Sequence, residues 1–336
     1  MSKSVVLGFS GGIDSCTAAQ HLRDEGYRVV ALTINTTNDY AMLDKAEAKA
    51  KELGVEWHRY DAVELFRREI IDYFISSYAN GYTPAPCTRC NTLIKWRILR
   101  DVADSLNIYH IATGHYINIV ERNNHHYIAR ALDNAKDQSY YLWGVDESTL
   151  RRIITPMGGV LKSDIRQNFA DRSESMGICF LNGCHYTEFL LTQNLELRPG
   201  NILTIDGRVV GQHNGIARYT IGQRRGAGIP EGLRVIGLNA EDNTLIVGEN
   251  SLLYKHTLYV KDCHIINHEE LLSATDITIM IRGIGRNPQR HVRVESIDNG
   301  YRVTCDDAAW APALGQPLVF YRNNLVIGGG IICGFE

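Results

Sequence analysis

The sequence predicts an α/β fold in which a parallel-sheet domain is followed by a small central module and a C-terminal β-barrel. Strand-like and helix-like segments alternate through the first third of the chain, as in a sheet wrapped by helices. The length of 336 residues exceeds one ordinary core, so more than one domain is expected. After Pro199-Gly200, short apolar segments are separated by turn signals, which predicts hairpins.

Hydrophobic runs, and the capping and turn residues that bound them, predict the helices and strands in order along the chain. An apolar run over 5–9 predicts the first strand, and a helix-like stretch begins at Asp14. The next predicted elements are a strand over 29–34, a helix over 43–53, a strand over 55–60, a helix capped by Asp61 and ending near Tyr78, a helix over 91–106 and a strand over 109–113. Turns are predicted at Asp206-Gly207, Asn214-Gly215 and Asp298-Asn299-Gly300. The expected domain boundaries are 1–195, 196–252 and 253–336.

Composition narrows the class of protein. The content of 44% hydrophobic and 22% charged residues is that of a soluble globular chain. No apolar run approaches a membrane span, and the first predicted strand leaves no room for a signal peptide, so we expect a cytoplasmic protein with no membrane partner. In that compartment, cysteines are reduced thiols, metal ligands or catalytic groups. The net charge of −3 excludes a uniformly basic nucleic-acid binder, although 223–226 and 282–293 are local basic patches.

The segment Ser10-Gly11-Gly12-Ile13-Asp14-Ser15 joins the first strand to the first helix. Adjacent glycines let the backbone approach an anion, and the amides and dipole of a helix start favour negative charge. No Lys-Ser or Lys-Thr pair follows the glycines, as it does in loops that transfer a terminal phosphate. The segment therefore predicts a loop that binds pyrophosphate in an adenylating enzyme. A turn without a ligand is the alternative, and the position after the first strand argues against it.

Three cysteines are expected in loops near one edge of the sheet, where ligands of parallel sheets bind. Cys87 and Cys90 have Cys-x-x-Cys spacing at a helix start, where the dipole favours the reactive thiolate. Cys179 lies far away in the sequence. An alternative is a structural zinc site that Cys184 and His185 help to complete. The remaining cysteines stand in apolar contexts that predict core positions; they are Cys16, Cys263, Cys305 and Cys333.

Seven motifs in order resemble the tRNA-specific 2-thiouridylase family, whose members place sulfur on C2 of the wobble uridine. They are Ser10-Gly11-Gly12-Ile13-Asp14-Ser15, Thr83-Pro84-Ala85-Pro86-Cys87-Thr88-Arg89-Cys90-Asn91 with Ile94-Lys95, Ala112-Thr113-Gly114-His115-Tyr116, Lys136-Asp137-Gln138-Ser139-Tyr140, Gly177-Ile178-Cys179-Phe180, Tyr219-Thr220-Ile221-Gly222-Gln223-Arg224-Arg225-Gly226, and Gly315-Gln316 ahead of Gly328-Gly329-Gly330. Each motif alone is a weak signal, whereas seven in order are specific.

The resemblance implies an adenine nucleotide α-hydrolase-like first domain and a role for each matching residue. The implied ATP-binding residues are Gly8, Phe9, Ser10, Gly11, Gly12, Ile13, Asp14, Ser15, Ile34 and Gly114. The implied tRNA contacts are Ala85, Pro86, His115, Lys136, Asp137, Gln138, Arg282, Gly283 and Gln316, with 85–87 approaching the target base. Cys90 matches the nucleophile, and Cys179 matches the cysteine that carries a persulfide.

The implied reaction begins when the uridine C2 oxygen attacks the α-phosphate of ATP, while Mg²⁺ offsets phosphate charge. Sulfur from a sulfur-donor protein or a sulfide source then displaces AMP. Two departures from the family pattern stand out: Cys87 replaces the usual Asp, and Ile34-Asn35-Thr36-Thr37 ends the second strand. Thiolates at Cys87, Cys90 and Cys179 suit a 4Fe-4S cluster with one open iron. We prefer the cluster because a third thiol is superfluous to the persulfide route, which stays open.

Two other functions compete with this interpretation. A ligase or sulfurtransferase acting on another substrate would use the same phosphate loop, but a ligase would not need three cysteines near the site. An RNA-binding protein stapled by zinc would not need the loop over 10–15.

Overall fold

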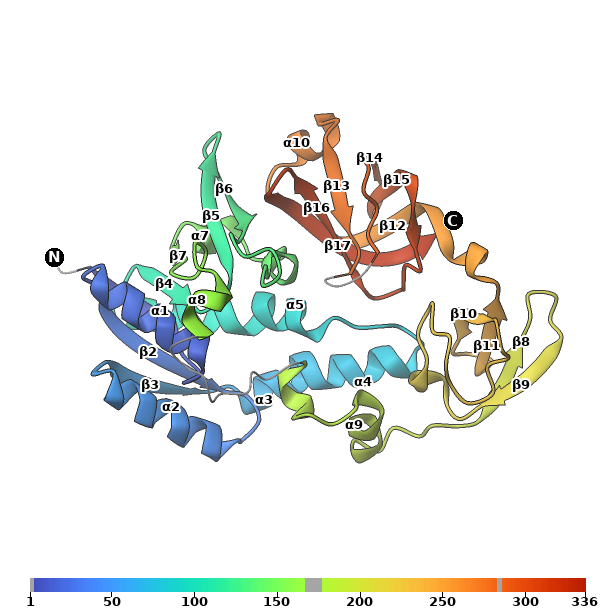
Figure 1. Ribbon diagram of the computed structural model, residues 1–336, viewed down its shortest axis with the longest axis horizontal. Coiled ribbons are helices and arrows are strands. Elements are labelled where there is room, and N and C mark those ends of the chain that lie inside the picture. The colour runs from blue at the N-terminus through green and yellow to red at the C-terminus, as the bar shows by residue number, and fades with distance from the viewer. Residues whose placement is uncertain (1–2, 167–176, 283–285) are drawn as a thin grey trace. The chain divides into compact units, whose positions relative to one another are not determined.

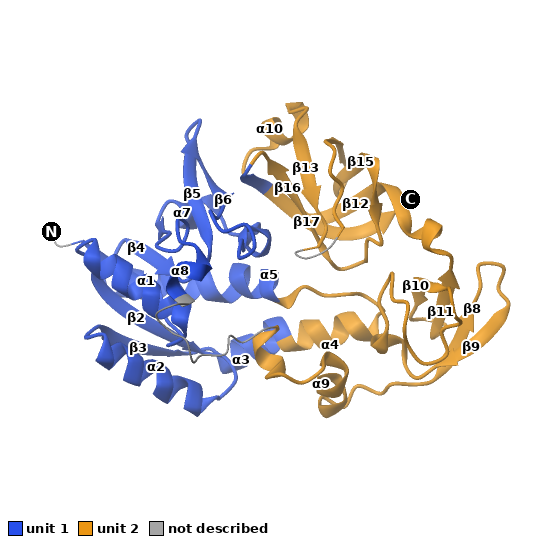
Figure 2. Cartoon of the chain, viewed as in Figure 1, with its two compact units in different colours: residues 1–70, 87–176, 324–327 blue, residues 71–86, 177–323, 328–336 orange. Residues whose placement is uncertain are grey.

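The structure is a computed structural model that describes residues 3–166, 177–282 and 286–336 (Figure 1). The chain divides into two units (Figure 2): unit 1 comprises residues 1–70, 87–176 and 324–327, and unit 2 comprises 71–86, 177–323 and 328–336. The predicted fold class is confirmed, since a parallel sheet precedes a mixed four-stranded sheet and a larger antiparallel sheet. No helix among the described residues is long and apolar enough to cross a membrane.

Unit 1 is built on a five-stranded sheet of order β3-β2-β1-β4-β7 in which every pair is parallel. Its strands are β1 (Ser4–Gly8), β2 (Arg28–Asn35), β3 (Glu56–Asp61), β4 (His110–Thr113) and β7 (Ile153–Ile154). Val5 and Leu7 of β1 are fully buried, because a central parallel strand is covered on both faces. The helices of the unit are α1 (Ile13–Asp24), α2 (Tyr40–Glu52), α3 (Val63–Phe66), α5 (Pro86–Cys90), α6 (Trp96–Ser105), α7 (Glu147–Leu150) and α8 (Lys162–Arg166), with π-helical segments at Arg67–Ile71 and Asn91–Lys95.

One helix start differs from the prediction. We expected a loop up to Cys90 and a helix from Asn91, but α5 begins at Pro86 and continues through the π-helical segment Asn91–Lys95 into α6. Proline is tolerated in the first helical turn, where its missing N–H would have no partner in any case. Cys87 and Cys90 therefore lie in a helical turn and not in a loop.

A hairpin in unit 1 was not predicted. Strands β5 (Ile117–Arg122) and β6 (His125–Arg130) pair antiparallel, and β6 also pairs with the first residues of β17 (Leu325–Phe335). Asn123 and Asn124, which join the strands, have φ of +52° and +64°. Successive positive φ values are typical of a tight hairpin turn, so this Asn-Asn pair was the missed signal.

The described part of unit 2 contains a small mixed sheet, most of a larger antiparallel sheet and two short helices, besides α4 (Asp72–Ala79). The first sheet has the order β10-β11-β8-β9 and the larger one contains β13-β16-β17-β12-β15-β14. The elements are α9 (Tyr186–Thr192), β8 (Gly200–Leu203), β9 (Val209–His213), β10 (Arg234–Asn239), β11 (Thr244–Gly248), β12 (Tyr254–Ile265), α10 (His268–Ser273), β13 (Ile277–Met280), β14 (Val292–Ile297), β15 (Gly300–Trp310) and β16 (Pro317–Arg322), with 3-10 turns that include Cys179–Leu181 and Ile216–Arg218. Only β8 and β11 pair parallel in the smaller sheet.

Two of the predicted turns are confirmed and one is wrong. Asp206-Gly207 connects β8 to β9, and Asp298-Asn299 connects β14 to β15. Asn214-Gly215 does not join two strands: Gly215 has φ of +110° and leads into a 3-10 turn. A Cβ at this glycine would lie 2.7 Å from Cβ of Leu197, so close packing rather than a hairpin requires the glycine.

The structure divides the four cysteines that we placed in the core. Cys16 and Cys305 are buried, as predicted, whereas Cys263 is half-buried and Cys333 is exposed. Cys333 stands where the pairing of β12 with β17 is irregular. Such an irregularity breaks the strict alternation of inward and outward side chains from which its burial was inferred.

Candidate active site

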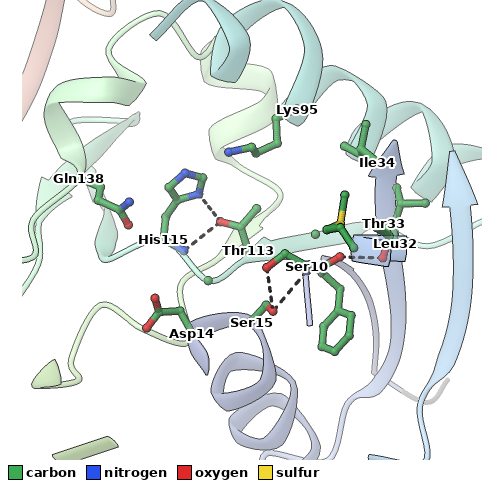
Figure 3. Close-up of a pocket in the computed structure, with 14 residues that line it drawn as sticks. Ser10, Asp14, Ser15, Leu32, Thr33, Ile34, Lys95, Thr113, His115 and Gln138 are labelled. Carbon is green, nitrogen blue, oxygen red and sulfur yellow. Dashed lines mark hydrogen bonds between the residues drawn. The ribbon is translucent and has the colours of Figure 1, made fainter. Parts of the chain in front are cut away.

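A cavity of about 270 Å³ lies at the carboxyl ends of β1, β2 and β4 (Figure 3). It is lined by Gly8, Phe9, Ser10, Asp14, Ser15, Leu32, Thr33, Ile34, Met42, Lys95, Thr113, Gly114, His115 and Gln138. Of the residues predicted to bind ATP, seven line this cavity, and the loop residues Gly11, Gly12 and Ile13 do not. His115 and Gln138, predicted as tRNA contacts, also line it. The parallel sheet thus brings together loops separated by more than a hundred residues.

The loop over 10–15 is held in place by its own side chains. Ser15 Oγ donates to the Gly12 carbonyl at 3.1 Å, and the Ser10 amide donates to Ser15 Oγ at 3.3 Å. Gly11 has φ of +67°, and a Cβ there would lie 2.9 Å from Cα of Ala46. No side chain among the described residues caps α1, whose N-cap is Gly12. The amides of its first turn can therefore serve an anion.

Gly114 brings a second loop against this helix start. A Cβ at Gly114 would lie 3.0 Å from the carbonyl carbon of Asp14 and 3.0 Å from the amide nitrogen of Ser15. These two contacts are with backbone atoms, which cannot swing away as a flexible side chain would. Glycine at this position allows the loop after β4 to pack directly against the start of α1.

Asp14 is anchored by two residues that the sequence did not reveal. Its Oδ1 accepts from the Tyr116 hydroxyl at 2.8 Å and from Lys162 Nζ at 2.5 Å. The Lys162 side chain is only 4% exposed, whereas that of Asp14 is 39% exposed. Lys162 comes 148 residues after Asp14, and no local pattern connects the two. The pair fixes one carboxylate oxygen beside the cavity.

His115 forms one wall of the cavity. Its Nδ1 lies 2.6 Å from Thr113 Oγ1, and its ring stacks on Trp96 with centroids 6.0 Å apart. Burial, and then the nearby charge of Lys95, hold the pKa of His115 well below the ordinary histidine value of 6.5. The imidazole is therefore neutral at pH 7.

The three residues of the Lys136-Asp137-Gln138 segment make different contacts. Gln138 exchanges two hydrogen bonds with the backbone of Tyr116, at 2.9 and 3.0 Å, and lines the cavity. Asp137 accepts from the Ala131 amide at 3.0 Å and from the Ser139 hydroxyl at 2.7 Å. Asp137 thereby shapes the loop, and the Lys136 backbone is held by the Asp133 carbonyl at 3.0 Å.

Cys87 and Cys90 lie one turn apart on α5, and both are half-buried. Next to them, Asn91 donates from Nδ2 to the Tyr141 carbonyl at 3.1 Å. Burial, and then the proximity of Cys87, raise the pKa of Tyr141. Ahead of the helix, Ala85 is half-buried and Pro86 is buried. The two thiols thus stand on a fixed helical turn.

In unit 2, the segment before α5 is tied to the β modules. The Thr83 amide donates to the Leu314 carbonyl at 2.9 Å, and Thr83 Oγ1 lies 2.7 Å from Thr220 Oγ1. Gly315, with φ of +88°, packs so close that a Cβ would lie 3.1 Å from Cβ of Tyr82. Contacts with the β modules therefore fix the position of Tyr82 and Thr83, which precede Ala85 in the chain.

Cys179 is exposed at the start of a 3-10 turn in unit 2, next to buried Phe180. The Phe180 ring packs against Phe74 and Phe189 with centroids 5.2 and 5.1 Å apart. An anchored aromatic beside an exposed thiol holds the segment while leaving the sulfur accessible. Among the described residues, no three His, Cys, Asp or Glu side chains are grouped to hold a metal ion. Both the predicted cluster and the zinc alternative with Cys184 and His185 stay unsupported by such a grouping.

Comparison with known proteins agrees with this geometry. Family descriptions match along the chain: a tRNA methyl transferase HUP domain over residues 3–183, a tRNA methyl transferase PRC-barrel domain over 188–249 and an aminomethyltransferase β-barrel domain over 255–332. The tRNA-specific 2-thiouridylase MnmA 2 of Phocaeicola vulgatus is 37% identical over 98% of both chains. This chain belongs to the tRNA-specific 2-thiouridylase family.

A further relative and a solved structure also show similarity to this chain. The tRNA-specific 2-thiouridylase MnmA of Clostridium acetobutylicum is 32% identical over 99% of this chain and 100% of its own. A solved 4-thiouridine synthetase–RNA complex with bound ATP has 18% identity and a TM-score of 0.34, over 50% of this chain and 40% of its own.

The remaining residues that the family resemblance assigns to tRNA lie in unit 2. One Arg282 nitrogen donates to the carbonyls of Ala311 at 2.6 Å and Ile221 at 3.3 Å, and the guanidinium lies 5.6 Å from the Trp310 ring centre. Arg286 lies 5.7 Å from the same ring. Gln316 has a buried Oε1 with no hydrogen-bond partner among the described residues. Gly283 falls outside the described residues.

Proposed function

We propose that this protein is an ATP-dependent tRNA-uridine 2-sulfurtransferase. The observation that carries the proposal is that one helical segment bears Cys87 and Cys90 at its start and Lys95 in the wall of the cavity beside the glycine loop. A nucleotide site and two thiols on one element suit a reaction that first activates an oxygen and then replaces it with sulfur. The full-length similarity to 2-thiouridylases supports the same substrate.

In this proposal, ATP occupies the cavity. The loop from Gly8 to Ser15 and the start of α1 bind the pyrophosphate portion, while Ile34 and Gly114 contact the nucleoside. Gly11 packs against the backbone of Ala46, and Gly114 packs against the backbone at the start of α1, so both glycines fix the shape of the loops around the cavity. The exposed part of the Asp14 carboxylate suits Mg²⁺, which takes one or two carboxylates together with phosphate oxygens. When bound, the ion would offset phosphate charge.

The chemistry then balances in two displacements. The uridine C2 oxygen attacks the α-phosphorus, forming an O–P bond while the bond to the β-phosphate oxygen breaks and pyrophosphate leaves. Sulfur attacks C2, and the C2–O bond breaks as AMP departs. The preformed loop and the cavity orient these groups and lower the reorganisation needed at each step.

Two sources of sulfur are compatible with the thiols. In the persulfide route, Cys179 carries a sulfane sulfur received from a donor protein. The Cys90 thiolate attacks Sγ of Cys179, a Cys90–Cys179 disulfide forms, the bond to the outer sulfur breaks and hydrosulfide leaves to attack C2; a thiol reductant then restores both cysteines. In the cluster route, Cys87, Cys90 and Cys179 hold a 4Fe-4S cluster whose open iron would bind a sulfide. The cysteine that replaces the usual Asp favours the cluster, and the exposure of Cys179 suits the persulfide.

The tRNA contacts are proposed to spread over three modules with boundaries at 1–195, 196–252 and 253–336. They comprise Ala85, Pro86, His115, Lys136, Asp137, Gln138, Arg282, Gly283 and Gln316. A chain that modifies tRNA belongs in the cytoplasm, which is where we place it.

The test is incubation, without oxygen, of the purified protein with ATP, Mg²⁺, sulfide and an unmodified tRNA transcript. We expect AMP and pyrophosphate in equal amounts and 2-thiouridine at the wobble position, measured by nucleoside mass spectrometry. Cys90→Ala should abolish thiolation. Formation of ADP and phosphate, or of a methylated nucleoside without AMP, would overturn the proposal.

The same preparation decides the source of sulfur. If the cluster route operates, iron and sulfide copurify and Cys87→Ala loses both iron and activity. If Cys87→Ala keeps full activity with no iron bound, the cluster route fails and Cys87 is a bystander. The persulfide route then predicts that thiolation depends on a protein that donates sulfane sulfur in place of sulfide, because sulfide alone cannot form a persulfide without an oxidant.

A further inference from the structure

The helical segment that carries the thiols contains an irregularity between Cys90 and Lys95. Residues Asn91–Lys95 are π-helical, and the Trp96 amide donates to the Asn91 carbonyl five residues back. In an α-helix, a residue five positions ahead is rotated by about 140°, so it faces a different side. The wider π turn brings it back toward the same side. This turn lies between the thiol of Cys90 and the side chain of Lys95, and π turns of this kind often mark functional sites.

Lys95 is also the cation of the cavity. Among the fourteen lining residues, it alone carries a lysine or arginine side chain, and Asp14 carries the carboxylate. Asp14 already accepts hydrogen bonds from Lys162 and Tyr116. No hydrogen bond or ion pair joins Nζ of Lys95 to another described residue. A half-buried ammonium that has no carboxylate partner suits an anionic ligand.

The surroundings leave this charge available. Figure 3 shows Lys95 and His115 pointing toward one another across the cavity from the glycine loop. His115 is kept neutral by burial and by Lys95 itself, so it neither competes for an anion nor neutralises one. On the opposite side of the cavity, the hydroxyl oxygens of Ser10 and Ser15 lie 3.4 Å apart.

We infer that Lys95 is a catalytic residue whose ammonium binds the α-phosphate of ATP and stays on that phosphate until AMP leaves. The inference rests on the proposed function. The glycine loop takes the departing pyrophosphate and Ile34 contacts the nucleoside, so the α-phosphate lies between them. When the C2–O bond breaks, the electron pair stays on the phosphate oxygen and AMP gains negative charge. A fixed ammonium stabilises that charge without reorganisation.

The experiment compares Lys95→Met, Lys95→Arg and Arg97→Met in single-turnover reactions with ATP, tRNA and sulfide. Arg97→Met is the matched control, because it removes an exposed charge from α6 that does not line the cavity. We expect Lys95→Met to slow AMP formation about 100-fold, with ATP affinity changed less than about threefold, because transition-state charge is lost. Lys95→Arg should retain an intermediate rate, and Arg97→Met should match the wild type.

A second measurement tests the position of the ammonium directly. The ³¹P spectrum of bound α,β-methylene-ATP should lose its enzyme-induced α-phosphorus shift in Lys95→Met and keep the γ-phosphorus shift. Loss of the γ shift alone, or wild-type rates in Lys95→Met, would overturn the assignment. If the wild type itself produces no 2-thiouridine, the proposed function fails instead. Thermal unfolding of each variant confirms that it is folded.

Discussion

Two regions of the molecule use cationic side chains in opposite ways. In unit 1, Lys95 lines a cavity, and its ammonium makes no hydrogen bond or ion pair with another described residue. In unit 2, Arg282 donates to the carbonyls of Ile221 and Ala311 and lies over Trp310. The family resemblance implied a tRNA contact for Arg282, whereas Lys95 entered only as part of a matching motif. A cation that already satisfies carbonyls has fewer N–H groups to offer, so its surroundings decide its role more than its charge.

The largest effect on turnover is expected at Asp14, which lines the same cavity as Lys95. Asp14→Ala removes the carboxylate from Lys162, whose side chain is only 4% exposed. Breaking one partner of a buried pair costs about 3 kcal/mol, and we expect turnover to fall about 1000-fold. Urea unfolding and single-turnover AMP formation measure the two effects.

The double variant Asp14→Ala/Lys162→Met separates stability from catalysis. It should recover at least half of the lost unfolding free energy, because no ammonium is left without its carboxylate. Turnover should stay low. Recovery of turnover would show that Asp14 only balances the charge of Lys162.

The glycine loop provides the next test. Gly11→Ala places an alanine in the left-handed backbone conformation of Gly11, which costs about 1–2 kcal/mol. Its Cβ would also lie 2.9 Å from Cα of Ala46. We expect ATP turnover to fall about 100-fold, since the loop must shift. Gly26→Ala is the control: its φ is +84° but nothing lies within 4 Å of a Cβ. It should lose stability by about 1 kcal/mol and keep its turnover. Equal losses in both variants would contradict a role for the close packing at Gly11.

These two sites show what a sequence can and cannot predict. Gly11 was predicted, because a glycine pair after a strand is a local signal for a phosphate loop, whereas Gly114 was implied only by the family resemblance. Lys162 and Tyr116 were not, because their contacts with Asp14 join segments far apart in the chain. The start of α5 at Pro86 was misplaced, because a turn-rich segment and a helical first turn both tolerate proline. The π turn before Lys95 has no glycine or proline to mark it.

Arg282 and Arg286 both lie over the indole ring of Trp310, so substitutions at these two residues test the unit 2 part of the comparison. Arg282→Met removes two hydrogen bonds to carbonyls, so we expect it to lower the unfolding free energy by about 2 kcal/mol and to weaken tRNA binding. Arg286→Met, at an exposed residue, should change stability by less than about 0.5 kcal/mol while reducing the salt dependence of tRNA affinity. Calorimetry and filter binding at several salt concentrations provide the measurements. Equal stability losses would contradict the contrast.

The smallest effect concerns pH, and it again compares the two units through His115 and His213. Burial lowers the pKa of both, and the charge of Lys95 lowers that of His115 further, whereas a hydrogen bond to the Asn243 carbonyl partly offsets the shift at His213. Below about pH 6.5, the two histidines bind protons in the unfolded chain but stay neutral in the folded protein. The free energy of unfolding therefore falls as pH falls. Each histidine contributes at most about 1.4 kcal/mol per pH unit to this slope.

His115→Gln should therefore reduce the loss of stability between pH 6.5 and 5 more than His213→Gln does. Lys95→Met should act in the same direction as His115→Gln but more weakly, because it removes the smaller of the two causes of the low pKa at His115. Denaturation curves at closely spaced pH values measure the slopes. If Lys95→Met leaves the slope unchanged, the ammonium does not act on the imidazole, and the cavity wall formed by these two side chains is not electrostatically coupled as the structure indicates.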